Sequence, residues 1–148
     1  MPISLQRATI QDIPALLSIE KSVAGTNIYS PMLEENEWIE EIQKNIVYLI
    51  KKDGITVGNV SYEKKSDDHV YISGLAIDAR FQNQGIAREA LSQILEELQD
   101  IKRIDLVTHP KNIAALKLYQ SFGFVVESRK ENYYGDGEPR LVLALKKK

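Results

Sequence analysis

Residues 82–87 read Gln-Asn-Gln-Gly-Ile-Ala and join two segments of opposite character. Residues 69–78 before them are rich in strand-forming side chains, and residues 85–100 after them place apolar side chains at intervals of three and four. A polar turn that leads into a helix presents free backbone N–H groups and the positive end of the helix dipole, both of which suit an anion. Gly85 and the small Ala87 would let phosphate oxygens approach the backbone. The segment predicts a phosphate-binding loop, although a glycine at a helix start is more often only a turn.

The sequence around this loop excludes two common classes of nucleotide site. A dinucleotide fingerprint needs G-x-G-x-x-G at the opening of a βαβ unit, and a triphosphate loop needs G-x-x-x-x-G-K-[ST]. Neither pattern is present in the chain. Both classes are therefore excluded.

A second motif lies downstream, where residues 112–124 read Asn-Ile-Ala-Ala-Leu-Lys-Leu-Tyr-Gln-Ser-Phe-Gly-Phe. Together with the loop, it resembles the GNAT family of N-acetyltransferases, whose patterns are [RQ]-x-x-G-x-[GA] and N-x-x-A-x-x-L-Y-x-x-x-G-F. The matching residues are Gln82, Gly85, Ala87, Asn112, Ala115, Leu118, Tyr119, Gly123 and Phe124. The resemblance also covers the order of helices and strands, and therefore most of the chain.

This resemblance implies acetyl-CoA as the donor substrate. In the family, the strand before the phosphate loop bulges and splays from the next parallel strand, and the pantetheine arm lies in the opening. Backbone groups of Leu75, Ala76 and Ile77 would then contact pantetheine, and backbone N–H groups of residues 82–87 would hold the pyrophosphate. The residues expected to bind the cofactor are Leu75, Ala76, Ile77, Gln82, Asn83, Gln84, Gly85, Ile86, Ala87, Arg88, Asn112 and Tyr119.

The implied reaction is direct attack of a neutral amine on the acetyl thioester. It needs an oxyanion donor, a proton acceptor for the amine and a proton donor for the departing thiolate. By the resemblance, a backbone N–H near Leu75 or Ala76 is the oxyanion donor, and Tyr119 is the general acid. The alternative for Tyr119 is a tyrosine that covers the core, because it lies beside the apolar stripe of its helix.

The general base is not defined by the resemblance, because residues 70–77 contain no carboxylate. His109, at the end of the neighbouring strand, is the candidate, since the reference pKa of histidine suits proton transfer. A structural or solvated histidine is the common alternative, and ordered water is an equal candidate for the proton acceptor.

The resemblance implies an amine acceptor, either a peptide N-terminus or a small molecule. The hairpin at residues 132–138 resembles the Tyr-Tyr hairpin of family members that acetylate protein N-termini, including ribosomal-protein alanine acetyltransferases. Tyr29, Tyr133 and Tyr134 are therefore expected at the acceptor site, although paired tyrosines in a hairpin are also ordinary packing. Those enzymes typically carry a glutamate after the leucine that Leu106 matches, whereas this chain has Val107. Five glutamates in the helix predicted over 33–44 could draw a cationic amine, although a solvated face is the commoner reason for such a run.

Three function classes follow from these residues. The first is an N-acetyltransferase. The second is a noncatalytic acyl-CoA-binding module, which the missing carboxylate would permit. The third is an α/β interaction domain whose glycine loop is only a turn.

The fold class predicted is a single α/β domain over residues 1–148, with a mixed, mostly antiparallel sheet, flanking helices and a central splayed parallel strand pair. Hydrophobic periodicity and turn residues give the order β-α-α-β-β-β-α-β-α-β-β. The strands are expected at 3–8, 46–51, 56–64, 69–78, 103–107, 124–134 and 140–146, and the helices at 9–24, 33–44, 85–100 and 112–122. Asp53-Gly54 predicts a tight hairpin, and Gly74 suggests a bulge or a close backbone approach.

Composition narrows the possible partners. The 148 residues carry a net charge of −2, which gives no general attraction to nucleic acid or to an anionic membrane. No cysteine is present, so a cysteinyl acyl intermediate and thiolate metal sites are excluded. His69 and His109 are the only histidines and have no metal-site spacing, so no metal is expected. No apolar run is long enough to cross a membrane, and a cytoplasmic monomer or homodimer is expected.

Overall fold

The computed structural model describes residues 2–25 and 31–147, so the expected acceptor-site residue Tyr29 lies outside the described residues. The helices and strands follow the predicted order. They are β1 (Ser4–Arg7), α1 (Ile13–Ser22), α2 (Glu35–Lys44), β2 (Ile46–Lys52), β3 (Ile55–Ser66), β4 (His69–Ile77), α3 (Ile86–Glu97), β5 (Arg103–Thr108), α4 (Ile113–Ser121), β6 (Val125–Lys130) and β7 (Arg140–Lys146). The predicted fold class is confirmed: a mostly antiparallel seven-stranded sheet with helices and one parallel strand pair.

The chain divides into two compact units that share β4. Unit 1 contains residues up to 24, residues 31–63 and residues 72–99, and unit 2 contains residues 64–71 and those from 100 onward. Through β4, the order of hydrogen-bonded strands is β1-β2-β3-β4-β5-β7-β6. Each unit therefore contributes one part of the strand order.

In unit 1, β1 pairs with β2 and β2 with β3, both antiparallel. The predicted turn between β2 and β3 is confirmed: Asp53 and Gly54 have φ values of 53° and 78°. Two successive left-handed residues match the twist of a tight hairpin, which is why Asp-Gly is favoured there.

The core of unit 1 joins α1 and α2 to β2. It contains Ala8, Ile13, Leu16, Trp38, Val47 and Leu49. The indole N–H of Trp38 donates to the carbonyl of Met32 at 3.0 Å, so the one polar group of this buried ring is satisfied. The predicted apolar stripe of α3 is confirmed at Ala90, Leu91, Ile94 and Leu98, which are buried, and Ile86 at the start of the helix is buried as well.

Two glycines allow β3 and β4 to lie close together. A methyl group on Gly58 would lie 2.5 Å from the carbonyl oxygen of Ala76, closer than carbon and oxygen tolerate. At Gly74, where a close approach was expected, a methyl group would lie 3.2 Å from Ser61 Oγ. The backbone N–H of Asp78 donates to the carbonyl of Val57 at 2.8 Å and fixes the end of β4 against β3.

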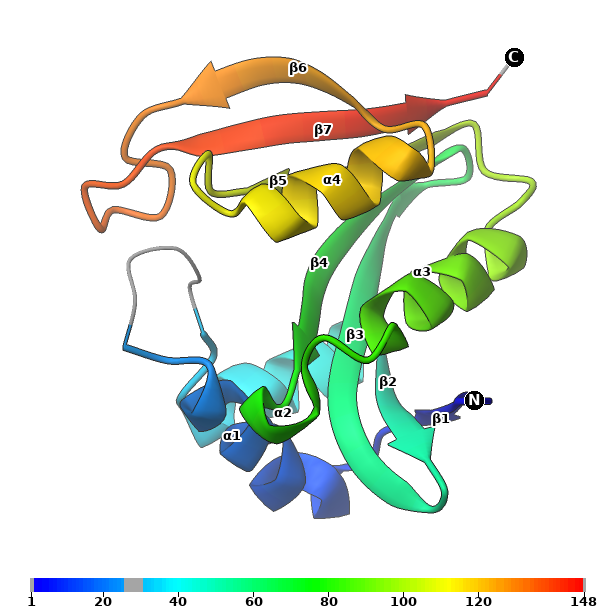
Figure 1. The fold of residues 1–148 in the computed structure, drawn as a ribbon, viewed down its shortest axis with the longest axis vertical. Coiled ribbons are helices and arrows are strands. Elements are labelled where there is room, and N and C mark those ends of the chain that lie inside the picture. The colour runs from blue at the N-terminus through cyan, green and yellow to red at the C-terminus, as the bar shows by residue number, and fades with distance from the viewer. Residues whose placement is uncertain (1, 26–30, 148) are drawn as a thin grey trace. The chain divides into compact units, whose positions relative to one another are not determined.

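In unit 2, the parallel pair is short. His69 to Tyr71 of β4 pair with Arg103 to Asp105 of β5. β5 then pairs antiparallel with β7, and β7 with β6, which form the hairpin at the top of Figure 1. The register of β6 shifts between Val126 and Ser128. Residues 72–77 of β4 therefore have no partner in the β5 register.

Within the described residues, no helix is long and apolar enough to span a membrane. The same residues contain no group of three or more histidine, aspartate or glutamate side chains that could hold a metal ion.

Candidate active site

The segment between β4 and α3 presents a run of unpaired backbone donors. Among the described residues, the N–H groups of Gln82 to Ala87 have no hydrogen-bond partner. Asn83 and Gly85 adopt positive φ values of 65° and 80°, and Gly85 is the residue that caps the N-terminus of α3. The first amides of a helix have no intrahelical acceptor, and the helix dipole adds positive potential there. The geometry suits an anion with several oxygens.

The entrance to this segment is held by Asp78, which is 3% exposed. Its carboxylate accepts the backbone N–H of Arg80 at 2.9 Å and the Arg80 guanidinium at 3.1 and 3.0 Å. The hydrogen bonds with the Arg80 side chain hold the pKa of Asp78 below its usual value. The backbone N–H of Phe81 donates to the carbonyl of Asp78 at 2.8 Å and closes one turn of 3₁₀ helix at Ala79–Phe81, where the sequence predicted only a turn. Arg80 therefore already shares its charge with a neighbouring carboxylate.

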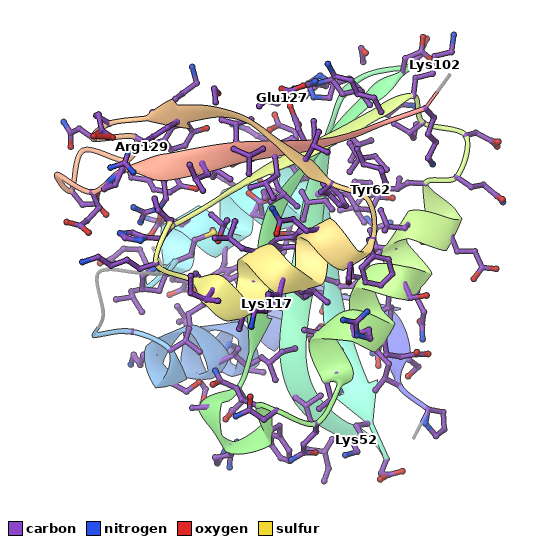
Figure 2. All side chains as sticks on the ribbon, turned by 45° about the horizontal axis from the view of Figure 1, so that its top comes forward. Lys52, Tyr62, Lys102, Lys117, Glu127 and Arg129 are labelled. Atoms are coloured by element: carbon purple, nitrogen blue, oxygen red, sulfur yellow. The ribbon has the colours of Figure 1, made fainter. Side chains whose placement is uncertain are left out.

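Lys52 approaches the loop from the end of β2 (Figure 2). Its Nζ donates to Oε1 of Gln84 at 2.7 Å. The amide of Gln82 donates to the carbonyl of Ile77 at 3.2 Å. These contacts fix two of the loop side chains and leave the backbone amides of the loop accessible for another partner.

Toward the end of β4, successive residues direct their backbone N–H and C=O groups alternately to the two edges of the strand. The carbonyl of Ala76 and the N–H of Asp78 both face β3, as their contacts with Gly58 and Val57 show. Because successive residues of a strand direct their N–H and C=O groups to opposite edges, Leu75 and Ile77 present theirs at the other edge. Of the three residues expected to contact pantetheine, Leu75 and Ile77 therefore have backbone groups that face away from β3.

In unit 2, the motif at residues 112–124 forms α4 with both ends defined. Asn112 Oδ1 accepts the backbone N–H of Ala115 at 3.2 Å, which caps the helix N-terminus. Gly123 adopts a φ of 99°, and the N–H of Phe124 donates to the carbonyl of Tyr119 at 3.2 Å, which closes the C-terminus. Most of the motif therefore has a structural explanation, because it begins and ends α4.

Tyr119 combines a buried ring with an accessible hydroxyl. The residue is 8% exposed, and its ring centroid lies 5.8 Å from that of Phe124. Its hydroxyl has no partner within the described part of the chain, yet it is not fully buried. Burial raises the pKa of Tyr119 to about 12. The phenol therefore keeps its proton at neutral pH.

His109, expected as a base, is 2% exposed and both of its ring nitrogens are engaged. Nδ1 accepts the backbone N–H of Lys111 at 3.0 Å, and Nε2 lies 2.8 Å from Oε1 of Glu138. Because a nitrogen that accepts a hydrogen bond carries no proton, the ring proton lies on Nε2 and points to Glu138. His109 could accept a proton from an amine only after one of these contacts opened.

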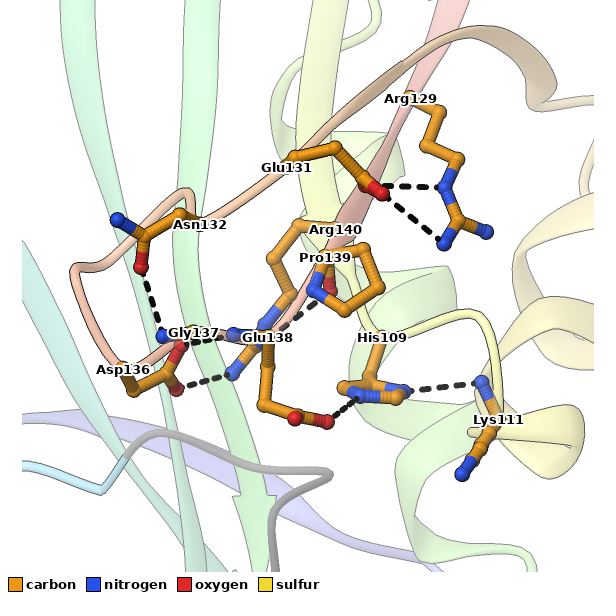
Figure 3. Close-up of polar contacts among 10 residues, drawn as sticks. All are labelled: His109, Lys111, Arg129, Glu131, Asn132, Asp136, Gly137, Glu138, Pro139 and Arg140. Atoms are coloured by element: carbon orange, nitrogen blue, oxygen red, sulfur yellow. Dashed lines mark hydrogen bonds and ion pairs between the residues drawn. The ribbon is translucent and has the colours of Figure 1, made fainter.

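The loop between β6 and β7 is held by a polar network around Arg140 (Figure 3). Arg140 is 2% exposed and donates to Asp136 at 3.3 Å and to the carbonyl of Pro139 at 3.0 Å. Asn132 Oδ1 accepts the N–H of Gly137 at 2.7 Å, and the N–H of Glu138 donates to Asp136 at 2.9 Å. The loop has a defined conformation, and its His109–Glu138 contact ties it to the end of β5.

Two tyrosines expected at the acceptor site, Tyr133 and Tyr134, lie in the loop that this network holds. Tyr133 and Tyr134 are 38% and 47% exposed and stack edge to face, with centroids 4.8 Å apart. The Arg140 guanidinium lies 5.0 Å from the centroid of the Tyr134 ring. They are adjacent in a turn and are not a cross-strand pair, so ordinary sheet packing does not explain them.

A third tyrosine, Tyr71 on β4, belongs to the same group. Burial and the neighbouring phenols of Tyr134 and Tyr133 raise the pKa of Tyr71. Tyr71 and Tyr133 line a hollow of about 440 Å³ together with Lys65, His69, Arg103, Asp105, Leu106, Val107, Glu127, Ser128, Lys130 and Val142. Val107, where the resemblance places a glutamate, also lines this hollow.

The sequence did not single out Tyr71, Glu138 or Arg140. Tyr71 lies on the strand that leads to the loop and alternates with buried residues, which was the available signal. Glu138 and Arg140 carried no signal, because charged residues beside a turn are usually solvated.

Comparison with known proteins agrees with the two motifs. The model of the acetyltransferase (GNAT) family matches residues 13–124. The L-amino acid N-acetyltransferase AaaT of Escherichia coli is 25% identical over 144 residues, which cover 88% of this chain and 88% of that protein. The ribosomal protein bS18-alanine N-acetyltransferase of Escherichia coli is 32% identical over 83 residues, which cover 53% of this chain and 56% of that protein. The match to this second relative thus extends over about half of its length.

Solved structures share the fold. The crystal structure of the ribosomal-protein-S18-alanine N-acetyltransferase from Escherichia coli has a TM-score of 0.84 at 23% identity and covers 98% of this chain and 94% of that chain. A GNAT family acetyltransferase from Elizabethkingia anophelis with acetyl-CoA bound has a TM-score of 0.74 at 19% identity and covers 98% of both chains. At these identities the likeness concerns the fold.

Proposed function

This chain belongs to the GNAT family of acetyltransferases, and from this premise we propose that it transfers the acetyl group of acetyl-CoA to an α-amine. The acceptor is a free amino acid or the N-terminus of a peptide. Acetyl transfer to an amine is the reaction class that the family match and the named relatives indicate. The noncatalytic module and the interaction domain are not favoured by this match.

The observation that carries the donor assignment is the run of unpaired amides from Gln82 to Ala87 at the N-terminus of α3. These donors would hold the pyrophosphate of acetyl-CoA, and the small Gly85 and Ala87 allow its oxygens to approach. The backbone groups of Leu75 and Ile77 that face away from β3 would contact the pantetheine amides. The acetyl-CoA-bound relative of the same fold supports this donor.

The chemistry follows from the groups that unit 2 supplies. The amine attacks the thioester carbon directly, since the chain has no cysteine to carry an acyl intermediate. Tyr119, whose phenol is protonated and has no other partner among the described residues, donates its proton to the departing thiolate. His109 holds the β6–β7 loop through Glu138 and acts as a positioning residue.

The acceptor assignment is supported by the exposed Tyr133 and Tyr134, since the buried Arg140 lies against the Tyr134 ring and Tyr133 packs on Tyr134. Phenol groups can donate to the carbonyl that neighbours an α-amine, in an amino acid or a peptide. The names of both relatives from Escherichia coli also specify amino acid or N-terminal alanine acceptors.

The test has two parts. Isothermal titration of acetyl-CoA measures donor binding, and release of free thiol is then followed with free L-amino acids, short peptides with free N-termini, the same peptides with blocked N-termini, and a polyamine. We expect thiol release with free α-amines and none with blocked peptides. Turnover of the polyamine alone would reject the α-amine acceptor, and absence of acetyl-CoA binding would reject the donor.

A variant addresses the acceptor side. Tyr134→Phe retains the ring above Arg140 but removes the hydroxyl, so the KM for the acceptor should rise while acetyl-CoA affinity is unchanged. Tyr48→Phe is the matched control, because the Tyr48 hydroxyl contacts Glu97 in unit 1. An unchanged acceptor KM in Tyr134→Phe would remove this residue from the acceptor site.

A further inference from the structure

A chain of three side chains joins the interior of unit 1 to helix α2. Ser61 on β3 is 3% exposed, and its Oγ lies 3.0 Å from Oγ of Ser73 on β4. Ser73 in turn donates to Oε1 of Glu41 at 2.9 Å. Because the Ser73 hydroxyl has one proton and gives it to the carboxylate, Ser61 must donate to Ser73. Both hydroxyl groups are therefore oriented toward Glu41.

These three hydrogen-bonded side chains meet β4 close to the segment expected to bind the cofactor. A strand advances about 3.3 Å per residue, so Ser73 and Leu75, two residues apart on β4, are about 7 Å apart along the strand. Leu75 begins the part of β4 that the proposed function assigns to the pantetheine and the thioester. Gly74 between them leaves room for the serine pair. The carboxylate of Glu41 is thus hydrogen-bonded to β4 near the predicted reaction centre, although residues 70–77 of β4 contain no carboxylate of their own.

We propose that Glu41 is the general base that accepts the proton of the attacking amine. As the nitrogen lone pair forms the C–N bond to the thioester carbon, the N–H proton passes to the Glu41 carboxylate. The C–S bond breaks with its electron pair on sulfur, and the thiolate is protonated by the general acid of the proposed function. Solvent then takes the proton from Glu41 and supplies one to the general acid, so the cycle needs no other reactant. This inference rests on the proposed acetyl transfer.

Three other carboxylates of unit 1, those of Glu20, Glu97 and Asp78, have their oxygens committed elsewhere. Glu20 is buried and accepts from the backbone of Met32 and the amide of Asn59. Glu97 accepts the hydroxyls of Tyr48 and Tyr62. Asp78 is paired with Arg80.

Glu41 differs from these because only Oε1 is used. Its second oxygen has no hydrogen-bond partner within the described residues. It lines a hollow of about 300 Å³ with Met32, Glu37, Glu40, Lys44 and Asn45. The neighbouring glutamates Glu37 and Glu40 would favour a cationic amine there. A carboxylate with one fixed and one available oxygen has the geometry that a general base needs.

A structural role is the competing explanation, because the same contact ties α2 to β4. Glu41→Gln separates the two roles, since glutamine keeps the side-chain length and an oxygen that accepts from Ser73 but cannot take a proton. We expect kcat to fall by about 100-fold or more, with acetyl-CoA affinity and the thermal midpoint unchanged. Glu96→Gln, the same exchange at an exposed glutamate of α3 that does not line this hollow, is the control and should retain wild-type kcat.

A second experiment uses added base. In Glu41→Ala, formate should restore kcat in proportion to its concentration, because it can occupy the vacated space and accept the proton. Ser73→Ala keeps the carboxylate but removes its hydrogen-bond donor, so kcat should fall by about tenfold, the equivalent of one charged hydrogen bond, without rescue by formate. Wild-type kcat in Glu41→Gln, or a loss in Glu41→Ala that formate does not reverse, would overturn the assignment. Absence of thiol release from the wild-type protein would instead reject the proposed function.

Discussion

The backbone N–H of Lys111 donates to Nδ1 of His109 at 3.0 Å, and this contact determines which ring nitrogen carries the proton. The other nitrogen, Nε2, then presents N–H to Glu138. We predict that nitrogen-15 chemical shifts of the His109 ring report the Nε2–H tautomer at neutral pH. A ring with its proton on Nδ1 would contradict this geometry.

The same relationship predicts how His109 variants behave. His109→Gln can still donate to Glu138 but cannot serve as a base, so we expect kcat within about tenfold of wild type, less than the loss of a general base would cause. His109→Ala leaves Glu138 without its partner and opens a buried cavity, and should cost about 2–4 kcal/mol of unfolding free energy, measured by urea denaturation. A large loss of kcat in His109→Gln with unchanged stability would instead support His109 as the base.

Tyr119→Phe should separate chemistry from folding. The hydroxyl has no partner within the described residues, so its removal should change stability by less than about 1 kcal/mol. If the phenol protonates the thiolate, kcat falls while acetyl-CoA affinity stays the same. Steady-state kinetics and isothermal titration measure the two quantities. Unchanged kcat would remove Tyr119 from the reaction.

The burial of Tyr119 should also make the unfolding free energy depend on pH in the alkaline range. Burial raises its pKa from 10.0 to about 12, so the unfolded chain loses this proton first as the pH rises. The native state is therefore destabilised between pH 10 and about 12, by about 2–3 kcal/mol in total. Tyr119→Phe lacks this contribution, and its unfolding free energy should fall less steeply in that range. Identical slopes for the two proteins would show that Tyr119 does not titrate in this way.

Gly85→Ala tests the phosphate loop against a matched control. Gly85 and Gly54 have φ values of 80° and 78°, and a methyl group on either would meet no atom within 4 Å. Alanine at either position should cost about 1 kcal/mol through the left-handed backbone. Only Gly85→Ala should weaken acetyl-CoA binding, by more than about tenfold if the amides no longer align. Equal affinities for the two variants would argue against the loop as the pyrophosphate site.

The role of Asn112 can be tested by a substitution that preserves its cap on the N-terminus of α4. Asp and Asn cap helices about equally well, so Asn112→Asp should retain stability, whereas Asn112→Ala should lose about 1 kcal/mol. If the Asn112 amide donates to the cofactor, Asn112→Asp would bind acetyl-CoA more weakly. If its only role is to begin α4, titration should give the wild-type affinity, which is the result the observed cap favours.

The features that could be predicted from the sequence are those that depend on residues close together in the chain. The three- and four-residue spacing of α3, the Asp53-Gly54 turn and the ends of α4 at Asn112 and Gly123 depend on nearby residues, and all were found in the structure. These features also located the loop and the strand before it. The reaction was then inferred from the resemblance to the family, which depends on the two motifs together.

Other features depend on residues far apart in the chain. Gly58 had no local signal, because its role appears only when β4 brings the carbonyl of Ala76 against it. Arg140 was unexpected because arginine is rarely buried without partners, and its partners are set by the loop. The four glutamates of α2 could not be distinguished until the fold placed Glu41 beside Ser73.

The two ends of α4 have a consequence for how such proteins are classified. Asn112, Gly123 and Phe124 begin and end a helix, and a pattern search that rewards them detects a helix of fixed length. A paralogue that exchanged Tyr119 for phenylalanine would keep nearly the whole signature. If Tyr119 is the general acid, that paralogue would differ from an active enzyme by one oxygen atom, so this position should be inspected before activity is assigned.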